Sequence, residues 1–90
     1  MNEIKKKQIA ILGSTGSIGT QALQVIEEHS ELYEVYALTA YNKVDLLIAQ
    51  ARKFLPEAVV IANEEKYVQL KEALSDLPVK VYAGTAALCQ

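Results

Sequence analysis

The chain has 90 residues, of which 51% are apolar and 22% are charged, and its net charge is −2. This length allows one small domain at most, and the charge balance provides no basic surface for nucleic acid and no polybasic patch for a membrane. No apolar segment has the length of a membrane span or of a signal-peptide core, and the lone cysteine, Cys89, excludes an internal disulfide and a cysteine-rich metal site. The composition therefore favours a cytoplasmic globular chain.

The first predicted element is a short buried strand near residues 8–12, and a glycine-rich turn follows it directly. The turn reads Gly13-Ser14-Thr15-Gly16-Ser17-Ile18-Gly19. A helix is predicted over residues 17–29, and its apolar side chains recur at helical spacing and are expected to be buried: Ile18, Ala22, Leu23, Val25 and Ile26. A strand, a glycine turn and a helix in this order predict a phosphate site, because the unpaired N–H groups and the positive dipole end of a helix N-terminus favour an anion.

Each glycine of the turn has a separate expected role. Gly13 permits the tight turn, Gly16 lets phosphates approach the backbone, and Gly19 lets the helix lie close to the sheet. The hydroxyl groups of the turn can cap the helix or donate to phosphate oxygens: Ser14, Thr15 and Ser17. The spacing Gly-x-x-Gly-x-x-Gly differs from the standard dinucleotide fingerprint. A turn without a ligand is the alternative, but it needs fewer glycines and hydroxyls than this heptad carries.

A second strand is predicted over residues 33–39 and a second helix over residues 43–55, which Pro56 ends. The side chains that this helix is expected to bury are Val44, Leu47, Ile48, Ala51 and Leu55. A third strand (58–62), a third helix (64–75) capped by Asn63, and a fourth strand (79–82) follow. The third helix is expected to bury Tyr67, Leu70, Leu74 and Leu77, and residues 85–88 predict the first turn of another helix.

This alternation predicts a Rossmann-like α/β fold, with three layers (α/β/α) around a parallel sheet of about four strands. The nucleotide-binding order places the first strand at the centre, the second beside it, the third outside, and the fourth on the other side of the first. The ligand crevice would then lie at the carboxyl ends of the first and fourth strands, beside the glycine turn. A flavodoxin-like strand order remains open.

The end of the second strand predicts which dinucleotide binds. NAD-binding domains carry an acid at this place, whereas this chain has Tyr41-Asn42-Lys43. A lysine and an amide supply donors to a 2′-phosphate, and a charge-assisted hydrogen bond of roughly 1.5–3 kcal/mol corresponds to about ten- to hundredfold in affinity. The predicted cofactor is therefore NADP(H), and the alternative is that Lys43 is a solvated lysine of a first helical turn.

Two segments, residues 11–19 (Ile-Leu-Gly-Ser-Thr-Gly-Ser-Ile-Gly) and 35–40 (Val-Tyr-Ala-Leu-Thr-Ala), resemble the N-terminal part of the 1-deoxy-D-xylulose 5-phosphate reductoisomerase family. The resemblance implies that the backbone of the loop contacts the NADPH diphosphate at Thr15, Gly16, Ser17 and Ile18. It places the 2′-phosphate site at residues 41–43, with Asn42 and Lys43 as its donors. Members of the family often carry Gly-Lys-Asn or Gly-Arg-Asn at these three positions, so this chain departs from the pattern there.

The resemblance also implies an activity, the NADPH-dependent conversion of 1-deoxy-D-xylulose 5-phosphate to 2-C-methyl-D-erythritol 4-phosphate in isoprenoid precursor biosynthesis. It implies Mg²⁺ or Mn²⁺ and a homodimer in the full-length enzyme. The catalytic and metal-binding residues of the family lie beyond residue 90, so residues 1–90 are expected to be an incomplete N-terminal NADP(H)-binding domain that is inactive alone. The alternatives are a non-catalytic dinucleotide-sensing domain and another NADP enzyme such as an aspartate-semialdehyde dehydrogenase.

Overall fold

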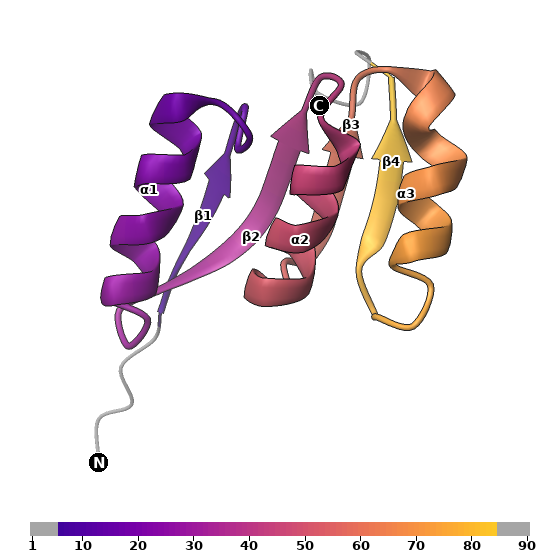
Figure 1. Ribbon diagram of the computed structural model, residues 1–90. Helices are drawn as coiled ribbons and strands as arrows, with labels where there is room; N and C mark the ends of the chain where they lie inside the picture. Colours follow the sequence, from indigo (N-terminus) through magenta and orange to yellow (C-terminus); the bar gives the residue numbers. More distant parts are fainter. Residues whose placement is uncertain (1–5, 85–90) are drawn as a thin grey trace.

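Strands and helices alternate along residues 6–84, which are the residues that the computed structural model describes (Figure 1). The strands are β1 (Lys7–Ile11), β2 (Tyr33–Ala40), β3 (Ala58–Ile61) and β4 (Lys80–Ala83). The helices are α1 (Ser17–Glu28), α2 (Val44–Phe54) and α3 (Tyr67–Ala73), with a short 3-10 helix, η1 (Glu64–Lys66), before α3. The predicted elements all occur in this range, except that the third helix begins as η1. The helical turn predicted over residues 85–88 lies outside the described residues.

The four strands are parallel and lie in the order β1-β2-β3-β4. The predicted order is wrong, because β4 pairs with β3, where Val81 lies opposite Val59, and not with β1. The helix α3 packs beside α2, and only a short turn separates it from β4, so the chain returns to the nearest free strand edge. Within residues 6–84 there is therefore no crevice between β1 and β4, which form the two edges of the sheet.

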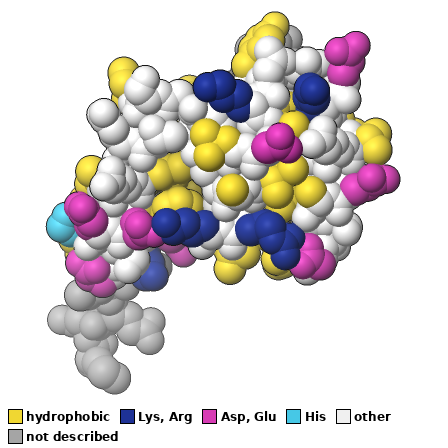
Figure 2. All heavy atoms as spheres, viewed as in Figure 1, with side chains coloured by type: hydrophobic (Ala, Val, Ile, Leu, Met, Phe, Trp, Pro, Cys, Tyr) yellow, Lys and Arg dark blue, Asp and Glu magenta, His cyan; other side chains and the backbone are white. Residues whose placement is uncertain are grey.

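The helices α1, α2 and α3 lie on the same face of the sheet (Figure 1). Each right-handed connection advances in the same direction, so it places its helix on the same side. Neighbouring helices are joined by an ion pair between Lys53 and Glu27 and by a hydrogen bond from Gln69 to Asp45 (3.1 Å). The α/β class with a parallel four-stranded sheet is confirmed, and the described residues form two of the three predicted layers. Figure 2 shows charged side chains of both signs scattered among apolar ones on this helical face.

The hydrophobic core lies between the sheet and these helices. Its most deeply buried side chains are Leu38, Leu47, Val59, Ile61, Leu70 and Leu74. Burial of a leucine contributes roughly 1.5–3 kcal/mol, so these contacts hold α2 and α3 firmly on the sheet. Alternate residues of the strands point to the opposite face, where Tyr82 is exposed.

Two predicted core positions of α1 are wrong. Ile18 is 85% exposed, and Val25 is exposed as well. The face that contacts the sheet consists of Gly19, Leu23 and Ile26. Because the backbone of the preceding loop lies against Gly19, the helix is rotated and Ile18 points away from the core.

Leu55 is the third predicted core position that the structure contradicts. It ends α2 in the left-handed conformation, with φ of 51°, and its side chain is exposed. The following residue, Pro56, cannot continue the helix and is itself buried, so the chain turns at Leu55 toward β3. The other predicted core side chains are buried or half-buried.

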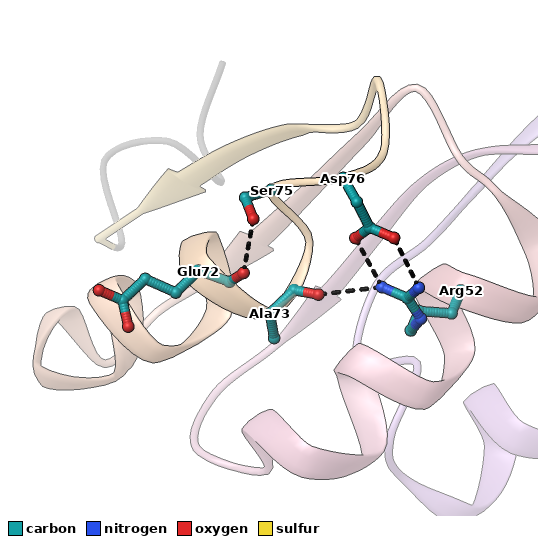
Figure 3. A network of polar contacts seen from close by, with 5 residues as sticks. All are labelled: Arg52, Glu72, Ala73, Ser75 and Asp76. Atoms are coloured by element: carbon teal, nitrogen blue, oxygen red, sulfur yellow. Dashed lines mark hydrogen bonds and ion pairs between the residues drawn. The ribbon is translucent and has the colours of Figure 1, made fainter.

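An exposed ion pair ties the end of α2 to the turn after α3 (Figure 3). The guanidinium of Arg52 donates two hydrogen bonds to the Asp76 carboxylate (2.9 and 2.8 Å) and one to the carbonyl oxygen of Ala73 (3.0 Å). The hydrogen bonds from Arg52 lower the pKa of Asp76 from 3.8 to about 2. This contact orders the turn that leads into β4.

We expect the pKa of Asp76 to depend on Arg52. Because the folded-state pKa is depressed, the stabilisation is present above pH 3.8 and is lost as the pH falls toward 2. In Arg52→Ala the pKa of Asp76 should rise toward 3.8, as measured by carboxylate NMR titration, because only the smaller effect of a backbone hydrogen bond still lowers it. Lys53→Ala is the control, since Lys53 pairs with Glu27 and should leave Asp76 unchanged. An Asp76 pKa that is the same with and without Arg52 would contradict this prediction.

Candidate cofactor site

The glycine-rich turn between β1 and α1 is a tight loop. Gly13 has φ of 70°, in the left-handed region that favours glycine, and its carbonyl oxygen accepts a hydrogen bond from the N–H of Gly16 (3.0 Å). The N–H of Thr20 donates to the carbonyl oxygen of Gly16 (2.9 Å), so α1 begins where the loop ends. The predicted role of Gly13 in turning the chain out of the strand is confirmed.

Gly19 allows the first turn of α1 to pack against this loop. A Cβ atom at Gly19 would lie 2.2 Å from the carbonyl oxygen of Gly13 and 2.7 Å from the Cα of Ser14. Real Cβ atoms do not approach backbone so closely, so the position requires glycine. The predicted partner of Gly19 was the sheet, and the structure corrects this, because the close approach is to the backbone of the loop.

Hydrogen bonds from β2 and α2 hold the inner side of the loop. Thr39 in β2 accepts at its Oγ1 from the N–H of Gly13 (2.9 Å) and at its carbonyl oxygen from the N–H of Ser14 (2.8 Å). The Nε2 of Gln50 in α2 donates to the carbonyl oxygen of Ser14 (2.8 Å). The hydroxyl of Ser14 is fully buried and donates to the same carbonyl of Thr39 (3.3 Å), so it is not available to a phosphate.

The outer side of the loop presents unpaired backbone donors. The N–H groups of Thr15, Ser17 and Ile18 have no hydrogen-bond partner within residues 6–84, and no side chain caps α1. The positive end of the α1 dipole lies at the same place. An anion that binds here would receive hydrogen bonds without displacing any that the fold makes.

A shallow pocket of about 250 Å³ opens beside the loop, at the carboxyl ends of β1, β2 and β3. Its lining residues are Leu12, Gly13, Thr39, Ala40, Tyr41 and Ala62. Leu12 and Tyr41 are large, apolar and exposed, which suits a flat ring that binds between them. The strand ends therefore offer an apolar surface next to the anion-binding loop.

The turn between β2 and α2 presents polar donors at the same edge of the sheet. Asn63 accepts from the N–H of Glu65 at its Oδ1 (3.0 Å), which confirms the predicted cap, and its Nδ2 donates to Oδ1 of Asn42 (2.6 Å). The remaining group of the Asn42 amide is its NH₂, a donor without a partner among the described residues. Lys43 is exposed and forms no ion pair within residues 6–84.

The acids nearest to this turn in the sequence are bonded elsewhere. Glu34 accepts from Gln8 (3.3 Å) at the start of β2, and Asp45 accepts from Gln69 of α3 (3.1 Å). The turn itself therefore carries a cation and an amide donor but no carboxylate, which is the arrangement that a phosphate requires.

Residues 6–84 contain neither a candidate metal cluster nor a candidate membrane span. No group of three or more His, Cys, Asp or Glu residues that could hold a metal ion occurs in residues 6–84. None of the helices in this range is long and apolar enough to cross a membrane.

Thr39 and Gln50 were not predicted as parts of the site. The sequence does indicate that Gln50 is unusual. It is a polar residue at a position that the spacing of Leu47 and Ala51 places on the buried face of α2. The hydrogen bonds of Thr39 depend on how β2 lies beside β1, which no spacing within one strand indicates.

Comparisons with known proteins agree on one family. Residues 9–90 match the family described as 1-deoxy-D-xylulose 5-phosphate reductoisomerase. A reductoisomerase of Bacteroides fragilis is 94% identical over the whole chain, and one of Porphyromonas gingivalis is 61% identical over 83 residues, or 92% of the chain. The chain spans 23% and 22% of these two proteins, less than a quarter of the length of the curated relatives.

Solved structures give the same result at the level of the fold. The reductoisomerase of Zymomonas mobilis in complex with NADPH superposes with a TM-score of 0.90 at 39% identity, over 93% of this chain and 22% of that one. A reductoisomerase in complex with NADPH, fosmidomycin and magnesium gives a TM-score of 0.86 at 36% identity, over 91% of this chain and 20% of that one. The chain belongs to the 1-deoxy-D-xylulose 5-phosphate reductoisomerase family.

Proposed function

We propose that this chain is the N-terminal NADPH-binding part of a 1-deoxy-D-xylulose 5-phosphate reductoisomerase. The loop backbone at Thr15, Gly16, Ser17 and Ile18 holds the diphosphate, and the turn at residues 41–43 holds the 2′-phosphate. The unpaired N–H groups of the loop, the α1 dipole and the adjoining pocket support this assignment. So does the NADPH in the solved relatives.

The strongest support for the proposal is the presence of glycine at position 16. The fold explains Gly13 by its positive φ and Gly19 by the collision of a Cβ with the loop. Steric contacts do not require Gly16, the N-cap of α1, which has φ of −81° and whose Cβ would meet only the carbonyl oxygen of Gly13, at an ordinary 3.5 Å. The close approach of a phosphate to the backbone gives this glycine a reason.

The turn after β2 supports NADPH over NADH. The NH₂ group of Asn42 and the ammonium of Lys43 are both free to donate to a 2′-phosphate, and no carboxylate in the turn repels it. Tyr41 lines the pocket beside them and offers its ring to the adenine. Because Asn42 and Lys43 are adjacent at the start of α2, one phosphate can contact both.

The activity of the full-length protein is part of the same proposal. The enzyme converts 1-deoxy-D-xylulose 5-phosphate to 2-C-methyl-D-erythritol 4-phosphate as a cytoplasmic homodimer, and bound NADPH supplies the hydride. The residues described here bind and orient the cofactor. We place the catalytic groups and the ligands of the divalent metal outside residues 6–84, which hold no suitable cluster of acids.

The experiment that tests the proposal is Gly16→Ala in the full-length protein. A methyl group at this position should weaken NADPH binding at least tenfold, because it holds phosphate oxygens away from the backbone. It should change the free energy of unfolding by less than about 1 kcal/mol, the usual effect of alanine at an N-cap. Fluorescence titration with NADPH and chemical denaturation measure the two effects. Unchanged NADPH affinity in a folded variant would refute the diphosphate site.

A further inference from the structure

Gln50 is a buried polar residue in the otherwise apolar inner face of α2. Gln50 is 7% exposed, and its neighbours on this face, Leu47 and Ala51, are fully buried. An amide at such a position loses its bonds to water, which is unfavourable unless the protein replaces them. Gln50 forms one replacement bond, through Nε2, and its Oε1 has no partner among the described residues.

The bond that Gln50 does form determines the orientation of one peptide unit in the cofactor loop. Its Nε2 donates to the carbonyl oxygen of Ser14 (2.8 Å), which therefore faces α2. The carbonyl of Ser14 and the N–H of Thr15 belong to the same planar trans peptide and point in opposite directions. When Ser14 C=O faces the core, Thr15 N–H must face outward, on the side where the loop presents its unpaired donors.

Part of the reason for this amide is stability, because an apolar side chain at position 50 would leave the buried carbonyl oxygen of Ser14 without its hydrogen bond. The unsatisfied Oε1 offsets some of this stabilisation. Thr39 already anchors the loop through Gly13 and Ser14. What Gln50 adds is control over the peptide that follows Ser14.

We propose that Gln50 is a positioning residue for the cofactor diphosphate, because it keeps the Thr15 N–H directed toward the phosphate oxygens. This inference rests on the proposed NADPH site. It makes the diphosphate contact depend on α2, the helix that begins directly after the proposed 2′-phosphate donors.

The test compares Gln50→Met with wild type in the full-length protein. Methionine keeps the length of the side chain but donates no hydrogen bond. We expect Kd and KM for NADPH to rise roughly tenfold, the equivalent of one charge-assisted hydrogen bond, and Kd for NADH to rise by the same factor, because both cofactors carry the diphosphate. Binding of 2′-AMP, which lacks a diphosphate, should not fall, even if the unpaired carbonyl oxygen of Ser14 lowers the melting temperature.

Gln24→Met is the matched control, since Gln24 lies exposed on α1 and should tolerate the same exchange without effect. A folded Gln50→Met that binds NADPH like wild type overturns the role of Gln50 and leaves the NADPH site standing. A loss of 2′-AMP binding together with a lower melting temperature, repeated in Gln50→Leu, shows a structural role and overturns it as well. Wild-type protein that binds no NADPH refutes the proposed function itself.

Discussion

Gly19→Ala is expected to lower the melting temperature and to weaken NADPH binding by the full-length protein about a hundredfold. The added Cβ would lie 2.2 Å from the carbonyl oxygen of Gly13, so the loop and α1 must separate by about an ångström. Overpacking of this kind costs about 1–3 kcal/mol, more than the gain of about 1 kcal/mol from alanine in a helix. The shifted loop can no longer aim its N–H groups at one diphosphate, and a misplacement of this size can cost about a hundredfold in function.

Gly16→Ala is the informative comparison for this variant. Both variants add one methyl group to the same loop, but the methyl at position 16 meets no backbone closer than 3.5 Å. Thermal denaturation and NADPH titration should therefore show that alanine at position 19 impairs folding and binding, and alanine at position 16 impairs binding alone. A Gly19→Ala protein with wild-type stability and affinity would mean that the loop does not pack on α1 in this way.

Lys43→Glu is expected to weaken the binding of NADPH much more than the binding of NADH. The change removes a cation from the proposed 2′-phosphate site and adds a carboxylate, so affinity for NADPH should fall about a hundredfold. NADH has no 2′-phosphate and should lose little. Stability should be maintained, because Lys43 is exposed at the N-terminus of α2 and a carboxylate there favours the helix dipole by about 0.3–1 kcal/mol.

The measurement is Kd for NADPH and for NADH, each at two salt concentrations. Lys80→Glu provides the control for net charge, because Lys80 is exposed on β4 at the opposite side of the sheet from β1. It should change both affinities little. Equal losses of NADPH and NADH affinity in Lys43→Glu would remove Lys43 from the 2′-phosphate site and leave Asn42 as its remaining donor.

The order of elements and the position of the loop followed from the sequence alone. Apolar runs at strand spacing, stripes at helical spacing and the turn residues act over a few residues, so they can be read locally. The same holds for Gly13, whose φ of 70° is a property of one turn, and for the Asn63 cap. Residues 11–19 and 35–40 were also sufficient to indicate the family, and the heptad at residues 13–19 predicted a phosphate site.

The tertiary structure alone decided which elements lie side by side. The sequence did not indicate that β4 pairs with β3, because both strand orders give the same alternation of strands and helices along the chain. The packing of α3 against α2 places β4 beside β3. Nor did the sequence indicate that Ile18 faces solvent, that Ser14 is buried, or that Gln50 bonds to Ser14 across 36 positions of sequence. These features depend on contacts between elements far apart in the chain, and such contacts leave no periodic pattern in either partner.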